Sequence, residues 1–427
     1  MGARPALAVE PRRMPATGLV RAPWPAVAAA ALLTVCGLIT AWRDLIPGIA
    51  YWDNAVGALV ASVRVTGPLA AGLAALIAAG RTPERRGAGL VRACAIAAAS
   101  YTALAIGVAA KTLWHDTSGH LVLSGILAGL AALLLHVVIG YAAGSLLRSP
   151  LTAPAAALLA YAADAWMLAR RGVWWRLLAP TSAPPESVFA HWRPAVFHGQ
   201  LAWYAGLALA VAAAYLLVTL GRRWLVVPLA AAVALAAFGV VQLHHYRGRA
   251  LAVSAPRDLV CRDWPLTVCV HPAMRGALQN LEIAAMPVAE RLSHTPGEFQ
   301  RLVQLPVGNG AVAGPGVRWI RLPALAHGYA DTAMTSVVRQ IPDPAACAAP
   351  GADAAATGLV LRWLATGQVD RRTAGGRAFG RLSEGERRAW LRAHYDQVRT
   401  CRVRTADFGW RQVVPRSAYA PHDTLAG

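Results

Sequence analysis

The residues with the clearest potential for chemistry in this 427-residue chain are ionisable side chains inside strongly apolar stretches. Arg64, His136 and Asp164 all lie in such stretches, and Lys111 lies near the end of another. Charged groups are costly in lipid, so they usually face the interior of a helix bundle or water, and they pair with one another. We expect Arg64 and Asp164 to pair, either as a structural contact between helices or as the lining of a pathway. Alternatively, the Arg64 side chain extends to a membrane interface.

Motifs for nucleotide, metal or covalent chemistry are missing from the sequence. It contains no G-x-x-x-x-G-K-[ST] phosphate loop, no H-E-x-x-H zinc motif and no G-x-S-x-G nucleophile motif. Glu282 and Glu290 are eight residues apart on a predicted helix, which fits a solvated face. We therefore predict no catalytic residue, no metal site, no cofactor and no enzymatic activity. Any ATP-driven role requires a separate ATPase subunit.

Long apolar runs dominate the first 245 residues, where charged side chains are rare. A bilayer core of about 30 Å requires roughly 20 apolar residues of helix. About seven segments meet or approach that length: Pro23–Trp42, Ala55–Gly80, Ala93–Leu113, Leu121–Leu147, Leu151–Leu168, Leu201–Leu220 and Trp224–Leu243. We predict an all-α polytopic membrane bundle over residues 23–245, in which the fifth span is short and the second is interrupted.

Arginines in the short connections predict the orientation of this bundle. With seven alternating spans, one side receives Arg4, Arg12, Arg13 and Arg21; Arg81, Arg85, Arg86 and Arg92; Arg148; and Arg222 and Arg223. The side richer in positive charge is cytoplasmic, which places residues 1–22 inside and the C-terminus outside the inner membrane. Arg170, Arg171 and Arg176 disagree with this pattern, and the tail would lie inside if the fifth span did not cross.

The remaining residues have a different composition, with many charges and no further long apolar run. Short strands around Pro265 and helices over Met274–Leu292, Thr357–Thr366 and Glu384–Arg399 predict a small α+β extracytoplasmic domain over residues 246–415. Ser383, followed three residues later by Glu386, forms a capping box for the last helix. Residues 416–427 are predicted to be a flexible tail.

Four cysteines lie in this tail domain: Cys261, Cys269, Cys347 and Cys401. In an oxidising compartment, four cysteines can form two disulfides with three alternative connectivities. We prefer Cys261–Cys269 together with Cys347–Cys401. Cys36 and Cys94 fall in apolar spans, where packing is their expected role.

The formal net charge of +20 suggests nucleic-acid binding at first sight. However, Lys111 is the only lysine, and much of the arginine lies in short loops beside apolar spans, where membrane topology explains it. We predict that nucleic acid is not a partner and that the lipid bilayer is. The arginines of the connector after the second span, Arg81, Arg85, Arg86 and Arg92, either reflect topology alone or form a docking surface for a cytoplasmic partner.

Several segments together carry a family resemblance. They are Val65-Thr66-Gly67-Pro68-Leu69-Ala70-Ala71-Gly72, Arg81 to Arg86, Gly140-Tyr141-Ala142-Ala143-Gly144, Pro150 to Ala157, Cys261 with Val268-Cys269-Val270-His271-Pro272, and Arg388-Ala389-Trp390-Leu391 with Cys401. In this order they resemble actinobacterial membrane proteins of the ABC-type exporter permease class with an appended extracytoplasmic domain. The extra span and the exported tail depart from ordinary six-span permeases.

The resemblance implies a membrane subunit of an export system that takes energy from a separate ATPase and forms a homodimer or pairs with a sister permease. The connector after the second span would then be the coupling contact. Two alternatives remain. One is a membrane-anchored sensor or envelope-interaction protein whose exported domain binds a ligand or partner. The other, a membrane-embedded enzyme, is the weakest because no catalytic constellation is present.

Overall fold

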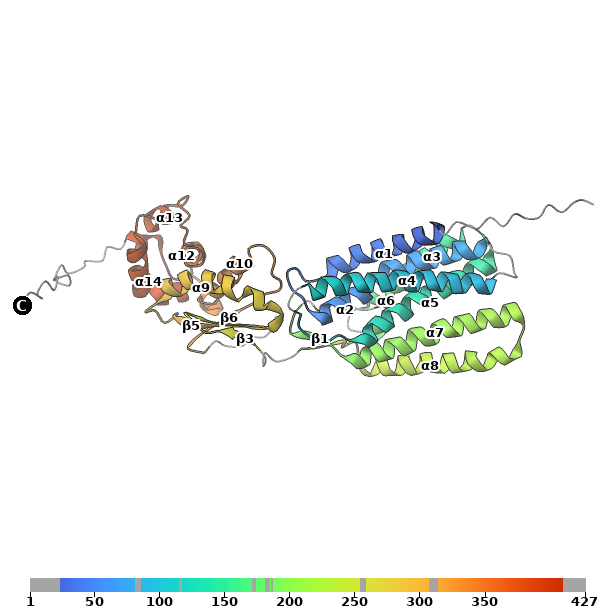
Figure 1. Cartoon of the computed structure of the whole chain (residues 1–427). Helices are drawn as coiled ribbons and strands as arrows, with labels where there is room; N and C mark the ends of the chain where they lie inside the picture. The colour runs from blue at the N-terminus through green and yellow to red at the C-terminus, as the bar shows by residue number, and fades with distance from the viewer. Residues whose placement is uncertain are drawn as a thin grey trace, which may run out of the picture.

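The computed structural model describes residues 24–80, 86–114, 117–149, 151–170, 174–180, 185, 187–253, 259–306 and 314–409. The predicted N-terminal segment 1–22 and the tail 416–427 lie outside these residues. A bundle of long helices and a smaller mixed α/β domain follow one another along the chain, and the domain lies at one end of the bundle (Figure 1). The predicted fold class, a helical membrane bundle followed by an α+β domain, is therefore confirmed.

The bundle is made from apolar helices that run along its long axis. They are α1 (Trp24–Asp44), α2 (Trp52–Ala61), α3 (Val63–Ala79), α4 (Arg86–Leu113), α5 (Leu123–Leu147), α6 (Thr152–Ala169), α7 (Pro194–Leu220) and α8 (Val226–His245). Among the described residues, six helical segments are long and apolar enough to span a bilayer, with α2 and α3 counted as one segment. The 3₁₀ turns η2 (Trp174–Leu178) and η3 (Arg223–Leu225) complete the bundle.

The fifth predicted span is α6, which is not among these six segments. Pro154, Tyr161 and Asp164 lower its apolar character. It nevertheless belongs to the bundle, where it packs against α3 and α5. Gly125 at the start of α5 lies against Phe197 at the start of α7, so both helices begin at the same end. The chain therefore returns along the bundle between them, through α6.

The second predicted span is split where the sequence indicated an interruption. Ser62 separates α2 from α3, and its hydroxyl donates a hydrogen bond to the Leu59 carbonyl at 2.6 Å. Pro68 lies inside α3 and cannot donate the backbone hydrogen bond of a regular helix. The two helices nevertheless form one continuous apolar segment, Trp52–Ala79.

Small residues bring α3 and α5 into close contact. Gly140 and Gly144 on α5 lie directly against the backbone of Ala71 and Ala75 on α3, where a Cβ atom would collide. Burial of apolar surface contributes little to helix association in lipid, so tight packing of small residues is a main source of affinity between membrane helices. This glycine face therefore positions α5 against α3.

The domain contains a four-stranded sheet covered by helices. Its strands are β3 (Val260–Arg262), β4 (Thr267–Val270), β5 (Phe299–Gln304) and β6 (Gly316–Ile320), in the spatial order β3-β4-β5-β6. The β3–β4 pair is antiparallel, and the other two pairs are parallel. The remaining elements are η4 (Pro272–Ala277), α9 (Leu278–Leu292), α10 (Tyr329–Val338), α11 (Pro344–Cys347), α12 (Ala354–Thr366), α13 (Ala374–Phe379), α14 (Glu384–Arg399) and η5 (Thr405–Gly409).

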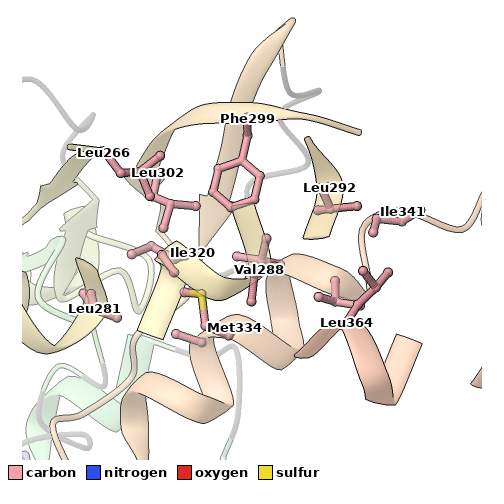
Figure 2. Close-up of a cluster of buried hydrophobic side chains, with 14 of the residues drawn as sticks. Leu266, Leu281, Val288, Leu292, Phe299, Leu302, Ile320, Met334, Ile341 and Leu364 are labelled. Atoms are coloured by element: carbon pink, nitrogen blue, oxygen red, sulfur yellow. The ribbon is translucent and has the colours of Figure 1, made fainter. Parts of the chain in front are cut away.

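A single apolar core joins the sheet to these helices. Figure 2 shows Phe299 and Leu302 of β5 meeting Val288 of α9, Met334 of α10 and further aliphatic side chains. The predicted helix Glu384–Arg399 is present with its Ser383–Glu386 capping box. The helix predicted from Thr357 begins earlier, because Asp353 accepts hydrogen bonds from the amides of Ala355 and Ala356.

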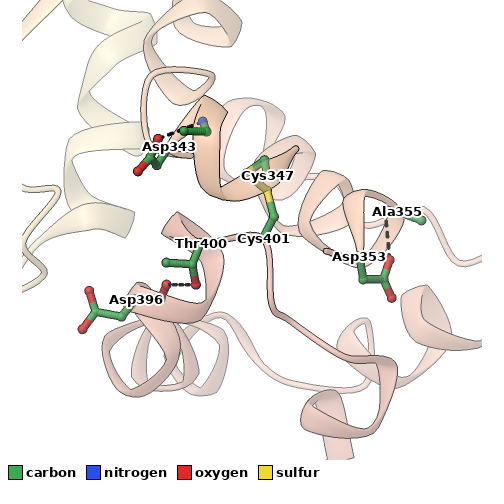
Figure 3. Close-up of a disulfide and its surroundings, with 8 residues drawn as sticks. Asp343, Cys347, Asp353, Ala355, Asp396, Thr400 and Cys401 are labelled. Carbon is green, nitrogen blue, oxygen red and sulfur yellow. Dashed lines mark hydrogen bonds between the residues drawn. A yellow bond between two sulfur atoms is a disulfide. The ribbon is translucent and has the colours of Figure 1, made fainter. Parts of the chain in front are cut away.

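Two disulfides cross-link the domain in the preferred connectivity. Cys261 and Cys269 are direct partners on the antiparallel strands β3 and β4. Cys347 at the end of α11 is bonded to Cys401, which follows α14, across a sequence separation of 54 residues (Figure 3). The Asp343 amide donates to the Arg399 carbonyl beside this bond. Disulfides persist in oxidising compartments, so both bonds are consistent with a location outside the cytoplasm.

One end of the bundle is attached to the domain, and we call it the proximal end and the opposite one the distal end. At the proximal end β1 (Ala190–Trp192) pairs antiparallel with β2 (Leu251–Val253), which joins the segment before α7 to the segment after α8. The Leu325 amide donates to the Pro47 carbonyl at 3.0 Å. The ring of His271 meets those of Tyr51 and Phe189 edge-on. The domain is therefore packed onto the bundle.

Candidate functional site: a bundle cavity with a buried histidine–aspartate pair

Two of the predicted intramembrane polar residues form a pair inside the bundle. The His136 Nε2 atom of α5 lies 3.2 Å from the Asp164 Oδ2 atom of α6, and the residues are 7% and 5% exposed. The expected Arg64–Asp164 ion pair is not formed, because Asp164 is turned toward His136 on α5 instead. His136 is one of the intramembrane polar residues identified from the sequence, but its spacing from Asp164 did not indicate that the two would pair.

The hydrogen bonds of His136 determine how many protons the pair holds. Its Nδ1 atom lies 2.8 Å from the Ala132 carbonyl oxygen, which can only accept, so Nδ1 carries a proton. The contact between Nε2 and Asp164 then needs one more proton, since two acceptors do not bond. That proton resides either on the imidazole, which gives an ion pair, or on the carboxyl. The pair is therefore a proton-holding site inside the bundle.

A cavity of about 340 Å³ opens beside this pair. Both His136 and Asp164 line it, and its other walls are almost entirely apolar. Its larger lining side chains include Leu135, Leu159, Met167, Trp203, Tyr204 and Leu207. α6 packs mainly on α3 and α5, whereas α7 packs mainly on α8 and α5, so the cavity occupies the space that remains between α6 and α7. A space of this size and polarity suits an apolar or amphiphilic molecule.

Arg64 lies near this site without forming an ion pair in the described part of the chain. Its Nε and Nη2 atoms are buried and have no hydrogen-bond acceptor there, and the same holds for Nε of Arg176 on η2. The charged groups within electrostatic reach of Arg64 are Asp44, Arg176 and Asp164. In the sequence, Arg176 is only an exception to the charge pattern, and the fold brings it within electrostatic reach of Arg64.

A network at the proximal end was not anticipated from the sequence. Asp53, near the start of α2, is 5% exposed and accepts a hydrogen bond from the Trp192 amide at 2.9 Å. The Trp192 indole donates to the Asp53 carbonyl at 2.8 Å, and the Tyr51 hydroxyl donates to the Ala190 carbonyl at 3.0 Å. Burial, reinforced by the Asp53 carboxylate, raises the pKa of Tyr51. These contacts fix β1 to α2.

A second hollow, of about 450 Å³, lies beside the end of α8. Its lining is basic and aromatic, and consists of Arg193, His244, His245, Tyr246, Arg247 and Arg249. The pairing of β1 with β2 brings Arg193 next to Arg249, because the Arg193 amide donates to the Ala250 carbonyl. Most of these side chains are exposed. This hollow is therefore an open, positively charged surface feature of the proximal end.

The predicted docking connector is only partly described. Arg81 and Arg85 lie outside the described residues, Arg86 is the first residue of α4, and Arg92 is exposed on that helix. At the other end of α4, the Lys111 ammonium lies 4.1 Å from the centre of the Trp42 ring. Among the described residues no three His, Cys, Asp or Glu side chains gather as a metal site would require.

No family model, curated protein or solved structure matches this chain. The fold and the site define a multi-pass membrane protein, which has six candidate spans among the described residues and a disulfide-bonded α+β region at its C-terminal side.

Proposed function

We propose that the protein receives an apolar or amphiphilic molecule from the bilayer in the cavity between α6 and α7, as the membrane subunit of an export system. The cavity itself supports this proposal, because its walls are apolar and a proton-holding His136–Asp164 pair lines it. Ionisable groups that face a cavity inside a membrane commonly mark a substrate or proton pathway.

The proposed orientation places the distal end in the cytoplasm and the domain outside. Arg148, Arg222 and Arg223 lie in short connections at the distal end, as the positive-inside rule requires of a cytoplasmic face. The two disulfides of the domain support the same orientation. An amphiphile that entered the bundle would thus leave toward a domain already packed on the proximal end.

Energy for export would come from a separate ATPase, in keeping with the resemblance of the sequence to exporter permeases. The connector between α3 and α4 is the proposed contact, since both helices would move when it is pushed. Arginines in the connector would meet acidic groups of the ATPase through charge-assisted hydrogen bonds. Changing Arg85 and Arg86 to Glu is expected to abolish co-purification of an ATPase in mild detergent, in protein of verified topology. A wild-type protein that retrieves no ATPase would contradict the export mechanism.

The proposed role of the cavity is tested by a substitution that fills the cavity with a larger side chain. Ala160 lines the cavity, whereas Ala162 on the same helix is exposed and does not line it. Protein purified in mild detergent is expected to retain a lipid-like molecule that mass spectrometry detects after extraction. Ala160→Trp is expected to lose this molecule and Ala162→Trp to keep it. Equal retention by both variants would show that the molecule binds elsewhere and would refute the proposed function.

A sensor or envelope-interaction role is the second candidate, and the packing of the domain on the bundle favours it. The hydrogen bond from Leu325 to Pro47 and the ring contacts of His271 would transmit a ligand-induced movement of the domain to α2. Under this alternative the partner binds the domain and no ATPase is retrieved. Cross-linking of intact cells from positions on the domain surface and on the distal end distinguishes the two candidates.

A further inference from the structure

Two arginines beside the cavity have donors that the protein leaves unused. Nε and Nη2 of Arg64 and Nε of Arg176 are buried and lack an acceptor in the described part of the chain. A buried N–H group without an acceptor is costly, and a guanidinium in an apolar bundle is more so. An acceptor supplied by another molecule would remove this cost.

The nearby carboxylates do not fill that role. Asp164 is committed to His136, and no bond joins Asp44 to Arg64 within the described residues. Arg176 adds a second positive charge within electrostatic reach of Arg64. Guanidinium groups with unused donors bind anions that carry several acceptor oxygens, phosphate in particular.

Neighbours of both arginines line the cavity, although the arginines are not among its lining residues. Asp164 lines the cavity and lies within electrostatic reach of Arg64. Leu178 also lines it and follows Arg176 by two residues on the same 3₁₀ turn. Helical side chains lean toward the N-terminus of their helix, so Arg64 leans toward the proximal end of α3. The arginines therefore form a polar site beside an apolar one.

We propose that Arg64 and Arg176 bind the phosphate group of an anionic lipid whose hydrocarbon chain fills the cavity between α6 and α7. This proposal rests on the proposed function and specifies the class of molecule that enters the bundle. A lipid fits better than free phosphate because the adjoining walls are apolar and offer a chain the burial that the bilayer otherwise provides.

The test uses the full-length protein in a neutral maltoside detergent with three probes: dodecyl phosphate, dodecanol and inorganic phosphate. Isothermal titration calorimetry measures the dissociation constants. The wild type is expected to bind dodecyl phosphate about ten- to a hundredfold more tightly than dodecanol, as hydrogen bonds to a charged group predict. Arg64→Gln and Arg176→Gln are each expected to remove most of this difference and leave dodecanol binding unchanged.

Arg170→Gln is the matched control, because Arg170 is an exposed arginine near η2 that stacks on Trp166. It is expected to bind all three probes as the wild type does. Arg176 lies on a 3₁₀ turn outside the long helices, so Arg176→Gln serves as the decisive variant if Arg64→Gln fails to fold.

The outcomes separate this proposal from the proposed function. If dodecyl phosphate and dodecanol bind equally, or if Arg170→Gln has the same effect as Arg176→Gln, the phosphate site is refuted while the cavity can still accept a chain. If inorganic phosphate binds as tightly as dodecyl phosphate, the ligand is a free anion and the lipid proposal is refuted. If neither dodecyl probe binds, or Ala160→Trp leaves both affinities unchanged, the cavity function fails as well.

Discussion

The bundle and the domain keep their structures by different means, although one chain forms both. The domain has a core of large aromatic residues, including Trp363, Phe379, Trp390 and Phe408, and two disulfides around it. The bundle instead brings helices together at alanine and glycine. Water supplies a hydrophobic driving force to the domain, while lipid supplies little to helix–helix contacts.

This contrast explains where function is expected. In the domain, Arg291 and Arg387 form ion pairs with Glu384, and the Trp363 indole donates a hydrogen bond to the same carboxylate. The Nε atoms of Arg318 and Arg387 nevertheless lack an acceptor within the described part of the chain. In the bundle, Arg64 and Arg176 retain buried donors without an acceptor among the described residues. Unused polar groups are most costly in a low-dielectric environment, so they are the stronger indication of a binding site.

The largest effect is expected from removing the long-range disulfide, which should destabilise the domain and leave the bundle unaffected. Replacing both Cys347 and Cys401 by Ser is expected to destabilise the domain by about 4 kcal/mol, because the bond closes a loop with a separation of 54 residues. Proteolysis during thermal unfolding measures the stability of the domain. Labelling of the free thiols Cys36 and Cys94 measures the bundle, which should be unaffected. Simultaneous loss of both regions would show that they unfold as one unit.

Removing the carboxylate of the buried pair is expected to have a nearly comparable effect on the bundle alone. Asp164→Ala should destabilise it by about 3 kcal/mol, because a buried polar partner is left unsatisfied. Asp164→Asn should cost much less, since its amide can donate to Nε2 while Nδ1 of His136 still donates to Ala132. Thiol labelling of Cys94 follows both variants. Equal losses would indicate that the charge, and not the hydrogen bond, stabilises the pair.

Adding one methyl group between α3 and α5 tests the close packing. Gly140→Ala places a Cβ atom against the backbone of Ala71, and an overpacked contact costs about 1–3 kcal/mol. Gly87→Ala is the matched control, because no atom lies near the corresponding position and alanine favours a helix. The thermal midpoint of the bundle should fall in the first variant and stay equal or rise in the second. A neutral Gly140→Ala would mean that the two helices tolerate separation.

The smallest expected effect is a pH-dependent one in the domain. Burial raises the pKa of Glu384, but hydrogen bonds from Trp363, Arg291 and Arg387 outweigh it, and the pKa lies below the ordinary value of 4.5. A lowered pKa in the folded state gives stability that is present above pH 4.5 and is lost as the pH falls through the folded value. Glu384→Gln should lower the free energy of unfolding of the domain by only about 1 kcal/mol at neutral pH, because water screens a partly exposed carboxylate.

Chemical denaturation of the wild type and Glu384→Gln at a series of pH values measures this effect. The difference in free energy of unfolding should be constant near neutral pH and shrink below pH 4.5. A difference that persists in acid would show that the shape of the side chain, and not its charge, stabilises the domain.

The sequence by itself determined the division into two regions, because hydropathy is summed over consecutive residues and needs no knowledge of the fold. It also determined the start of α14 through the Ser383–Glu386 capping box, which is a local feature. The cysteine count predicted two disulfides among three alternative connectivities, and the structure shows the preferred one. The ionisable residues of the bundle were identified for the same reason, as exceptions within apolar runs.

Only the tertiary structure decided how those residues are used. Asp164 meets His136, 28 positions away, because the glycine face of α5 sets its position against α3 and α6 packs on both helices. The cavity exists because α6 and α7 share α5 as a neighbour but otherwise pack on different helices, α3 and α8, which no run of sequence records. Arg176 approaches Arg64 only after the chain returns through η2. Contacts between helices depend on their rotation and separation, and these are set by packing over the whole bundle.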